Sequence, residues 1–388
     1  MRWLKRLVVI MLITLLTSGM INVNAEQPIK KNKPILNNGA KWRIGFCQSE
    51  PYQDYASNFY YIIKGLEETG WVSGTKDLPF KVGQDDTKEM WDWLALRAAG
   101  KYIEFVKDAH YDLKEMSSQG VSDKKKIITR LQRKKDIDLM IVTGTAAGLA
   151  LSKRDHSVPT LVFSTSDPVG SGIIKSAADS GKDNVWAHVD QGQFRRQVQV
   201  FHDIFKFKKM GLVYEDSELG HSYIAFNDIE AVAKESGFNL ISYYVKEPVD
   251  SSDQERYYRD LRVAYQKIAE EIDAMLLTVS PTKPEMLAEL LTPFYKHQIP
   301  VFSQGGALEV KYGALMSITQ NDYQNLQKFA AGTIANVFHG AKPRELPQIF
   351  ESTPRIILNL EVAKKVGYKP SFDILYVADE IYRKIDRE

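Results

Sequence analysis

Two short apolar runs lie close together in residues 138–172: Leu139-Met-Ile-Val142 and Thr160-Leu-Val-Phe163. Continuous apolar runs of this length are typical of strands buried on both faces, as in a parallel sheet. Each run is followed by a turn of small and polar residues, TGTAAG at 143–148 and STSDPVGSG at 164–172. In an open parallel sheet, ligands bind just beyond the carboxyl ends of the strands. We therefore interpret the two turns as one wall of a ligand site.

Strand-like and helix-like segments alternate along the rest of the chain, in two sets. Such alternation predicts right-handed βαβ units and parallel sheets. We predict an α/β protein with two doubly wound parallel-sheet lobes and a cleft between them. The first lobe is expected to hold residues 41–187 and 318–348, the second residues 190–317 and 350–375, and a helix is expected at 376–388. Clefts between domains are preferred sites for small molecules.

The N-terminus has the pattern of a secretory signal. Arg2, Lys5 and Arg6 precede an apolar run, and Val23-Asn-Ala25 supplies small residues at the usual cleavage offsets. We predict a signal peptide at 1–25 that is cleaved after Ala25, then a flexible leader at 26–40, and hence a periplasmic or otherwise extracytoplasmic protein. The alternative is an uncleaved membrane anchor, for which the apolar run is short.

Charge and cysteine content exclude some classes of protein. Residues 1–25 contain three bases and no acid, so the formal charge of +2 for the whole chain becomes −1 without them. A nearly neutral chain gives no electrostatic reason to expect nucleic acid as a partner. Cys47 is the only cysteine and lies in an apolar run, so we expect a buried thiol and no internal disulfide.

Catalytic and metal-binding patterns are missing from the sequence. The run at 144–148 lacks the Gly-Lys-Ser/Thr of a P-loop, and there is no G-x-S-x-G or H-E-x-x-H motif. The seven histidines are scattered without metal-ligand spacing. We therefore expect no catalytic residue, no metal and no cofactor.

Polar residues recur at the carboxyl ends of the expected strands. Each one alone is best explained as a helix cap, because Ser, Thr and Asp are preferred there. Their repetition at consecutive strand ends favours a binding site instead, with acids for an ammonium group and Tyr52 for stacking. The candidate ligand-binding residues are Gln48, Ser49, Tyr52, Thr145, Ala146, Ser164, Thr165, Ser166, Asp167, Asp190, Glu215, Ser217, Thr278, Ser280 and Gln304.

Several motifs carry a resemblance to a known family. They include GLEETGW at 65–71, TGTAA at 143–147, FSTSDPVGSGI at 163–173, NVWAHVD at 184–190, GLVYEDSE at 211–218 and NLEVAKKVG at 359–367. With these motifs the chain resembles the ABC transporter substrate-binding family that includes tryptophan- and tyrosine-binding lipoproteins. It departs from the family at Glu50-Pro-Tyr52, where a His-Pro pair is common, at Glu215, often Asn, and in residues 74–100, which look inserted.

The resemblance implies a type I periplasmic-binding-protein fold and a monomer that captures an amino acid or similar zwitterionic or aromatic metabolite. It also implies closure by hinge motion and delivery of the ligand to the membrane permease of an ABC importer. Two alternatives remain open: a sensor subunit that presents its ligand to a membrane receptor, and a secreted enzyme that uses cleft carboxylates.

Overall fold

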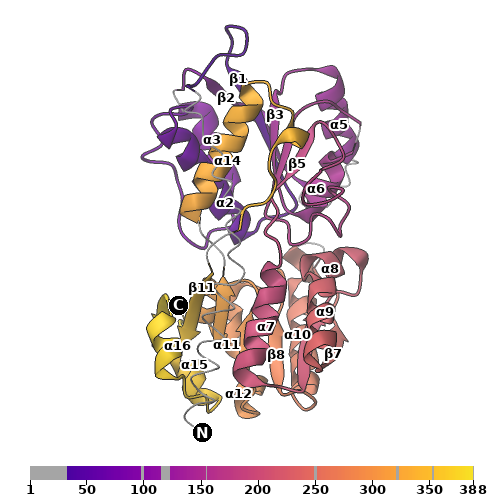
Figure 1. Ribbon diagram of the computed structural model, residues 1–388, viewed down its shortest axis with the longest axis vertical. Coiled ribbons are helices and arrows are strands. Elements are labelled where there is room, and N and C mark those ends of the chain that lie inside the picture. The colour runs from indigo at the N-terminus through magenta and orange to yellow at the C-terminus, as the bar shows by residue number, and fades with distance from the viewer. Residues whose placement is uncertain are drawn as a thin grey trace.

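The computed structural model describes residues 33–97, 100–114, 123–153, 155–248, 251–319, 323–351 and 354–387. Two lobes are stacked along the long axis of the molecule, and each is built around its own sheet (Figure 1). The expected signal peptide at 1–25 and the leader up to residue 32 lie outside the described residues. None of the described helices is both long enough and apolar enough to cross a bilayer.

The first lobe contains a five-stranded parallel sheet in the order β2-β1-β3-β4-β5. Along β3, Leu139 and Ile141 face one apolar cluster while Met140 and Val142 face another, so helices cover both faces of the sheet. This burial confirms the parallel sheet predicted from the apolar runs. The strands are β1 (Trp42–Gln48), β2 (Ile103–Asp112), β3 (Leu139–Thr143), β4 (Thr160–Phe163) and β5 (Val185–Ala187).

Helices from two distant parts of the sequence cover the first sheet. α14 returns from the second lobe and packs along α2, where a Cβ at Gly65 would lie only 2.3 Å from the carbonyl oxygen of Gln327. Glycine at 65 therefore allows the two helices to approach closely. The helices of this lobe are α2 (Gln53–Glu68), α3 (Lys88–Arg97), α5 (Asp123–Arg133), α6 (Thr145–Leu151) and α14 (Tyr323–Phe338).

The second lobe contains a seven-stranded sheet in the order β12-β11-β10-β9-β8-β6-β7. β11 runs antiparallel to β10, and the other pairs are parallel. Met210 and Met275 face opposite apolar clusters, so this sheet is also covered on both sides. The strands are β6 (Lys209–Tyr214), β7 (Asn239–Tyr244), β8 (Ala274–Leu277), β9 (Val301–Ser303), β10 (Met316–Thr319), β11 (Arg355–Asn359) and β12 (Glu380–Tyr382).

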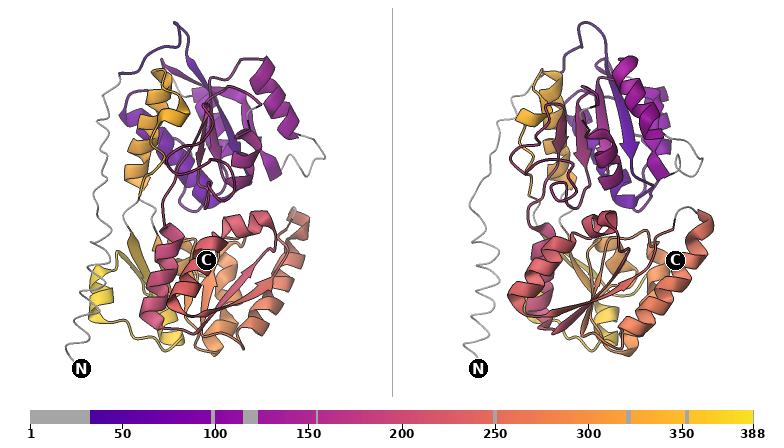
Figure 2. Two further views of the ribbon diagram at one scale, coloured as in Figure 1. Left: turned by 45° about the vertical axis from the view of Figure 1, so that its right-hand side comes forward. Right: turned by 90° about the vertical axis from the view of Figure 1, so that its right-hand side faces the viewer.

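Nine helices are described in the second lobe, with most of the longer ones flanking its sheet (Figure 2). They are α7 (Gln193–Phe205), α8 (Glu218–Tyr223), α9 (Phe226–Ser236), α10 (Gln254–Ile268), α11 (Leu287–Leu290), α12 (Thr292–Lys296), α13 (Ala307–Lys311), α15 (Leu360–Lys365) and α16 (Phe372–Val377).

Two of the segments that connect the lobes are bonded to each other. Val189 and Ile349 form a parallel bridge, and the Val189 N–H donates to the carbonyl of Gln348 at 2.8 Å. A ring nitrogen of His188 lies 3.1 Å from the carbonyl oxygen of Phe350. Hydrogen bonds therefore hold these two connecting segments side by side between the lobes.

Three expectations about boundaries need correction. The helix expected at 376–388 is wrong: α16 ends at Val377, and Glu380–Tyr382 is a strand because it completes the edge of the second sheet beside β11. Residues 318–319, expected in the first lobe, belong to β10 and pair with β11 in the second sheet. The described part of the leader is also held in place, since the Trp42 indole donates to the carbonyl of Ile35 at 2.9 Å.

Candidate functional site

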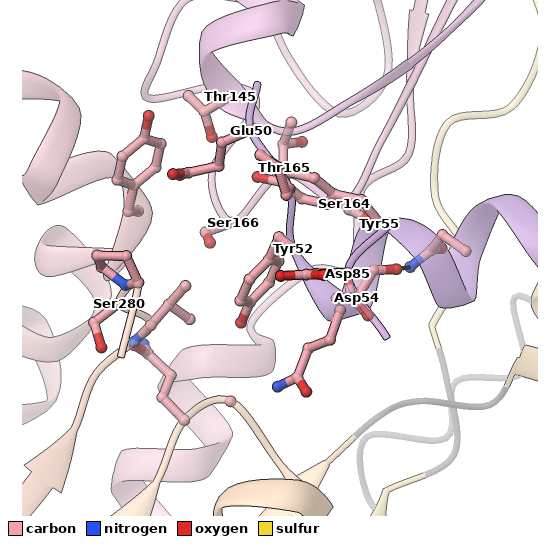
Figure 3. A pocket seen from close by; sticks show the side chains of 18 of the residues that line it. Glu50, Tyr52, Asp54, Tyr55, Asp85, Thr145, Ser164, Thr165, Ser166 and Ser280 are labelled. Atoms are coloured by element: carbon pink, nitrogen blue, oxygen red, sulfur yellow. Dashed lines mark hydrogen bonds between the residues drawn. The ribbon is translucent and has the colours of Figure 1, made fainter. Parts of the chain in front are cut away.

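A cavity of about 560 Å³ lies between the lobes and is lined by residues of both. From the first lobe it receives the loop after β1, the start of α2 and the turn after β4; from the second it receives the loops after β8 and β9. These loops follow the carboxyl ends of parallel strands, so the sheets bring together segments that are far apart in sequence. Figure 3 shows side chains of both lobes around this space.

The hydroxyl groups of the first lobe owe their position to two unusual backbone sites. Ser164 has φ +52°, in the left-handed region, so the chain turns sharply where β4 ends. Gly144 has φ +87°, and a Cβ there would lie 2.3 Å from the Tyr55 hydroxyl. Thr145 can therefore begin α6 directly against the cavity. The Thr165 hydroxyl oxygen is buried and has no hydrogen-bond partner among the described residues, so its hydrogen-bonding capacity is unused in this arrangement.

Asp54 is one of the carboxylates of the first-lobe wall. It lies in the first turn of α2 and accepts a hydrogen bond from the Tyr323 hydroxyl at 2.8 Å. Burial raises the pKa of Asp54, an effect that hydrogen bonding opposes. Tyr323 is itself fixed by stacking on Tyr61, with ring centroids 4.8 Å apart. The result is a rigid acidic and aromatic corner in the cavity.

Aromatic rings line the same wall. Tyr52 and Tyr55 meet edge to face with centroids 5.1 Å apart, and Figure 3 shows both beside the cavity. Burial raises the pKa of each hydroxyl well above its usual range, so both are neutral donors at physiological pH. Rings of this kind stack on aromatic or aliphatic groups and attract cations.

A second group of acids gathers at one edge of the cleft, around a smaller adjoining cavity of about 310 Å³. Glu50 of the first lobe forms an ion pair with Lys114 at 2.6 Å. Glu247 of the second lobe faces them, and burial, with the nearby charges of Glu50 and Glu215, raises its pKa to about 8. Glu215 in turn accepts the backbone N–H of Glu247 at 2.8 Å. Carboxylates from the two lobes therefore face each other here.

The second-lobe wall is built on buried hydrogen bonds. Gln304 accepts the Val279 N–H at 3.1 Å and donates to the Ile224 carbonyl at 2.8 Å. Below it, Glu309 accepts from the Ser303 hydroxyl at 2.6 Å, and burial raises the pKa of Glu309 to about 7. These bonds fix the turn after β9 that forms the cavity floor.

The structure sorts the sequence candidates into three groups. Eight line the main cavity: Tyr52, Thr145, Ser164, Thr165, Ser166, Asp190, Ser280 and Gln304. Four line the smaller adjoining cavity: Ser49, Ala146, Glu215 and Ser217. Three line neither: Gln48, Asp167 and Thr278.

Each residue of the third group has an internal partner. Gln48 donates to Asp112 at 2.7 Å and accepts from Thr87 at 2.6 Å. Asp167 accepts the Gly170 N–H at 2.6 Å, and Thr278 donates to the Val213 carbonyl at 3.2 Å. These polar atoms therefore bond within the fold, and a role of the three residues in ligand binding stays a prediction.

Sequence reasoning missed Asp54, Tyr55, Asp85, Glu247 and Tyr323, all of which line the main cavity. Asp54 and Tyr55 lie only a few residues beyond the first strand, so extending the strand-end search into the first helical turn finds them. Tyr323 begins a helix that returns from the other lobe, and Asp85 lies in the region that looks inserted. No local pattern marks those two. Among the described residues, no group of three or more His, Cys, Asp or Glu side chains is placed to hold a metal ion.

Comparisons with solved structures agree with this architecture. The chain is similar to an ABC domain of Streptococcus pneumoniae solved with L-Trp, at 18% identity and a TM-score of 0.65 over 88% of this chain and all of that one. It is also similar to a conserved domain protein of Vibrio cholerae, at 17% identity and a TM-score of 0.65 over 88% of this chain and 99% of that one. A third structure is the ligand-free, open form of a Clostridium difficile substrate-binding protein, at 17% identity and a TM-score of 0.58 over 88% of this chain and all of that one.

These likenesses identify the fold as that of the periplasmic binding proteins, with two α/β lobes and a cavity between them. No curated protein matches the chain in sequence. The family model for ABC transporter substrate binding proteins matches residues 95–382. The chain therefore belongs to the ABC transporter substrate-binding protein family, as its motifs indicated.

Proposed function

We propose that this protein is exported, captures an amino acid or a similar zwitterionic metabolite between its lobes, and delivers it to an ABC importer. The observation that carries the proposal is the interlobe cavity of about 560 Å³, which has room for a small molecule and is lined by both lobes. A ligand that contacts both lobes favours the closed form, because it gains contacts there that the open form lacks.

The lining chemistry supports a zwitterion. Thr145, Thr165 and Ser166 offer hydroxyl donors to a carboxylate, and Lys283 lines the opposite wall. Asp54 offers a carboxylate to an ammonium group, and Tyr52 and Tyr55 offer ring faces to the rest of the ligand. The L-Trp bound to the similar pneumococcal domain is consistent with this ligand class.

The transport role rests on the family and on the connection between the lobes. The bonded pair of segments at Val189 and Ile349 is the place where we expect the hinge, with the two sheets moving as rigid bodies. We expect a monomer that docks on a membrane permease when it is closed, after export through the signal at 1–25.

The direct test measures binding of each of the twenty amino acids to the purified protein, with thermal shift and calorimetry as the readouts. We expect at least one to raise the melting temperature and to bind with one-to-one stoichiometry. Thr165→Val should weaken that binding, because it removes a cavity hydroxyl with little change of shape. Thr292→Val in α12 serves as the matched control. Failure of every amino acid, with no small metabolite detected by mass spectrometry of the purified protein, would refute the proposal.

A further inference from the structure

The segment from Leu78 to Asp86, here called the strap, crosses from the first lobe toward the second. Its residues Gly83 and Asp85 line the main cavity. A Cβ built at Gly83 would lie 3.3 Å from a methyl carbon of Leu308 in α13, so the strap backbone touches the second lobe. The strap precedes residue 95, where the match to the family model begins, and it lies in the region that looked inserted. It is therefore a feature of this chain that the family match does not cover.

Both ends of the strap are anchored in the first lobe. At one end Leu78 is buried, and Phe80 stacks on Tyr60 with centroids 4.2 Å apart. At the other end Asp86 accepts the N–H of Lys88 at 2.6 Å and so caps α3. The tip of the strap is stabilised by an internal hydrogen bond, in which the Gln84 side chain accepts the Lys81 N–H at 2.6 Å. A loop fixed at both ends presents its side chains at defined places.

Asp85 is the charged group that the tip presents to the cavity. Its carboxylate has no hydrogen bond or ion pair with any residue that the structure describes. Figure 3 shows it among the side chains that surround the cavity, together with Asp54. Asp54 in turn accepts a hydrogen bond from a neutral hydroxyl, not from a cation.

The charges of the cavity do not balance. Two of the charged residues that line it form ion pairs with partners of opposite charge. Lys114 pairs with Glu50, which also lines the cavity, and Asp190 pairs with Arg196, which does not. Asp54 and Asp85 remain on the first-lobe side, with Lys283 as the remaining lysine. Glu247 also lines the cavity, but burial raises its pKa to about 8, so it is mostly protonated and neutral at pH 7. One ammonium facing two carboxylates leaves an excess of negative charge, which a ligand with a net positive charge neutralises.

We infer that the strap is a specificity element and that Asp85, acting with Asp54, selects an amino acid with a positively charged side chain. The inference rests on the proposed function and names its substrate class. In this arrangement Lys283 and the hydroxyls take the ligand carboxylate, and the first-lobe acids take its ammonium or guanidinium groups. Asp85 contacts the cation at the edge of the cavity, where the strap meets α13.

The test compares L-arginine with L-citrulline, in which a neutral urea group of nearly the same shape replaces the guanidinium. Calorimetry at pH 7 should show that the unmodified protein binds L-arginine about tenfold or more tightly than L-citrulline. Asp85→Asn should reduce that ratio about fivefold by weakening L-arginine alone, as expected when one charge contact worth about 1 kcal/mol is lost. Asp77→Asn makes the same charge change on an exposed residue just before the strap, and it should leave the ratio unchanged.

Each other outcome is decisive. L-citrulline binding as tightly as L-arginine to the unmodified protein would overturn the inference, as would a ratio that Asp85→Asn leaves intact at an unchanged melting temperature. The same holds if neither compound binds while an amino acid without a positively charged side chain does, and in that case the proposed function stands. If no amino acid binds at all, the proposed function itself is what fails.

Discussion

Asp167 illustrates how one polar residue after a strand can be given two different roles. Its place beside Ser164 and Ser166 favoured a ligand contact, and those two serines do line the cavity. Asp167 instead turns toward its own loop and accepts the Gly170 N–H at 2.6 Å. A Cβ at Gly170 would lie 2.0 Å from an Asp167 carboxylate oxygen, so the turn is built around this contact.

We predict that Asp167→Ala lowers stability and leaves ligand affinity within about twofold. The loss should be about 1 kcal/mol, as for removal of a capping hydrogen bond. Urea unfolding and calorimetry with the same sample measure the two quantities. A large loss of affinity without loss of stability would show that Asp167 contacts the ligand. Ser166→Ala is the comparison, and we expect it to lower ligand affinity while leaving stability unchanged.

Glu309 provides a prediction about pH. Its carboxyl is buried under the cavity floor, and burial raises its pKa from 4.5 to about 7. The folded protein therefore holds this proton more tightly than the unfolded chain, so stability falls as the pH rises from about 4.5 to about 7. We expect Glu309→Gln to remove this dependence. The unfolding free energy of the variant minus that of wild type should therefore increase by up to about 3 kcal/mol from pH 5 to pH 8. Equal slopes of unfolding free energy against pH in the two proteins would contradict the prediction.

Among the elements, the start of α15 shows what a family motif does physically. Asn359 is fully buried, and its oxygen accepts the N–H groups of Glu361 and Val362 at 3.1 and 3.2 Å. Its amide nitrogen donates to the carbonyl of Val310 at 2.9 Å. One side chain thus caps α15 at the end of β11 and ties both to the end of α13. The Asn-Leu-x-x-Ala-Lys pattern at 359–364 belongs to the framework of the second lobe.

We predict that Asn359→Ala destabilises the protein by about 2–3 kcal/mol, because it removes the cap of α15 and the buried amide donor to the Val310 carbonyl. Asn359→Asp keeps the capping oxygen and loses the donations of the amide nitrogen to the Val310 and Lys384 carbonyls, so the two variants separate the cap from these donations. Thermal unfolding monitored by circular dichroism measures both. If Asn359→Ala unfolds like wild type, the cap is not a stabilising element of the second lobe.

At the scale of the whole molecule, the facing carboxylates couple the position of the lobes to pH. Glu247 is held near Glu50, Glu215, Lys114, Tyr223 and Lys246 at the cleft edge. Opening the cleft returns Glu247 to water, where its ordinary pKa is 4.5, while the present arrangement raises it to about 8. We therefore expect the present arrangement of the lobes to bind a proton that a more open form would release, and closure to become less favourable as the pH rises through this window.

We expect affinity for a ligand of fixed charge to fall by at least about tenfold between pH 5 and pH 8 and to level off above pH 8. The test uses one of the twenty amino acids that is found to bind and whose side chain does not ionise between pH 5 and pH 8. Glu247→Gln should flatten the profile, whereas Glu218→Gln on the neighbouring helix α8, outside both cavities, should leave it unchanged. An affinity that rises with pH in the unmodified protein would show that Glu247 does not control closure.

The prediction of the fold and of half of the site followed from local patterns. Leu139-Met-Ile-Val142 and Thr160-Leu-Val-Phe163 could be recognised as buried strands because a strand covered on both faces is apolar throughout. The turns after them face the cavity because parallel strands share a carboxyl edge, a consequence of connectivity alone. The sequence by itself thus determined two α/β lobes, a cavity-lining edge on each, and the family.

Only the tertiary structure decided which polar residues meet at that edge. Asp54 and Tyr323 are separated by more than 250 residues and lie on helices that become neighbours when the chain returns to the first lobe. Asp85 reaches the cavity on a strap whose course depends on its anchors at Phe80 and Asp86. Side-chain direction, burial and charge balance depend on such long-range contacts, and a local sequence pattern carries no information about them.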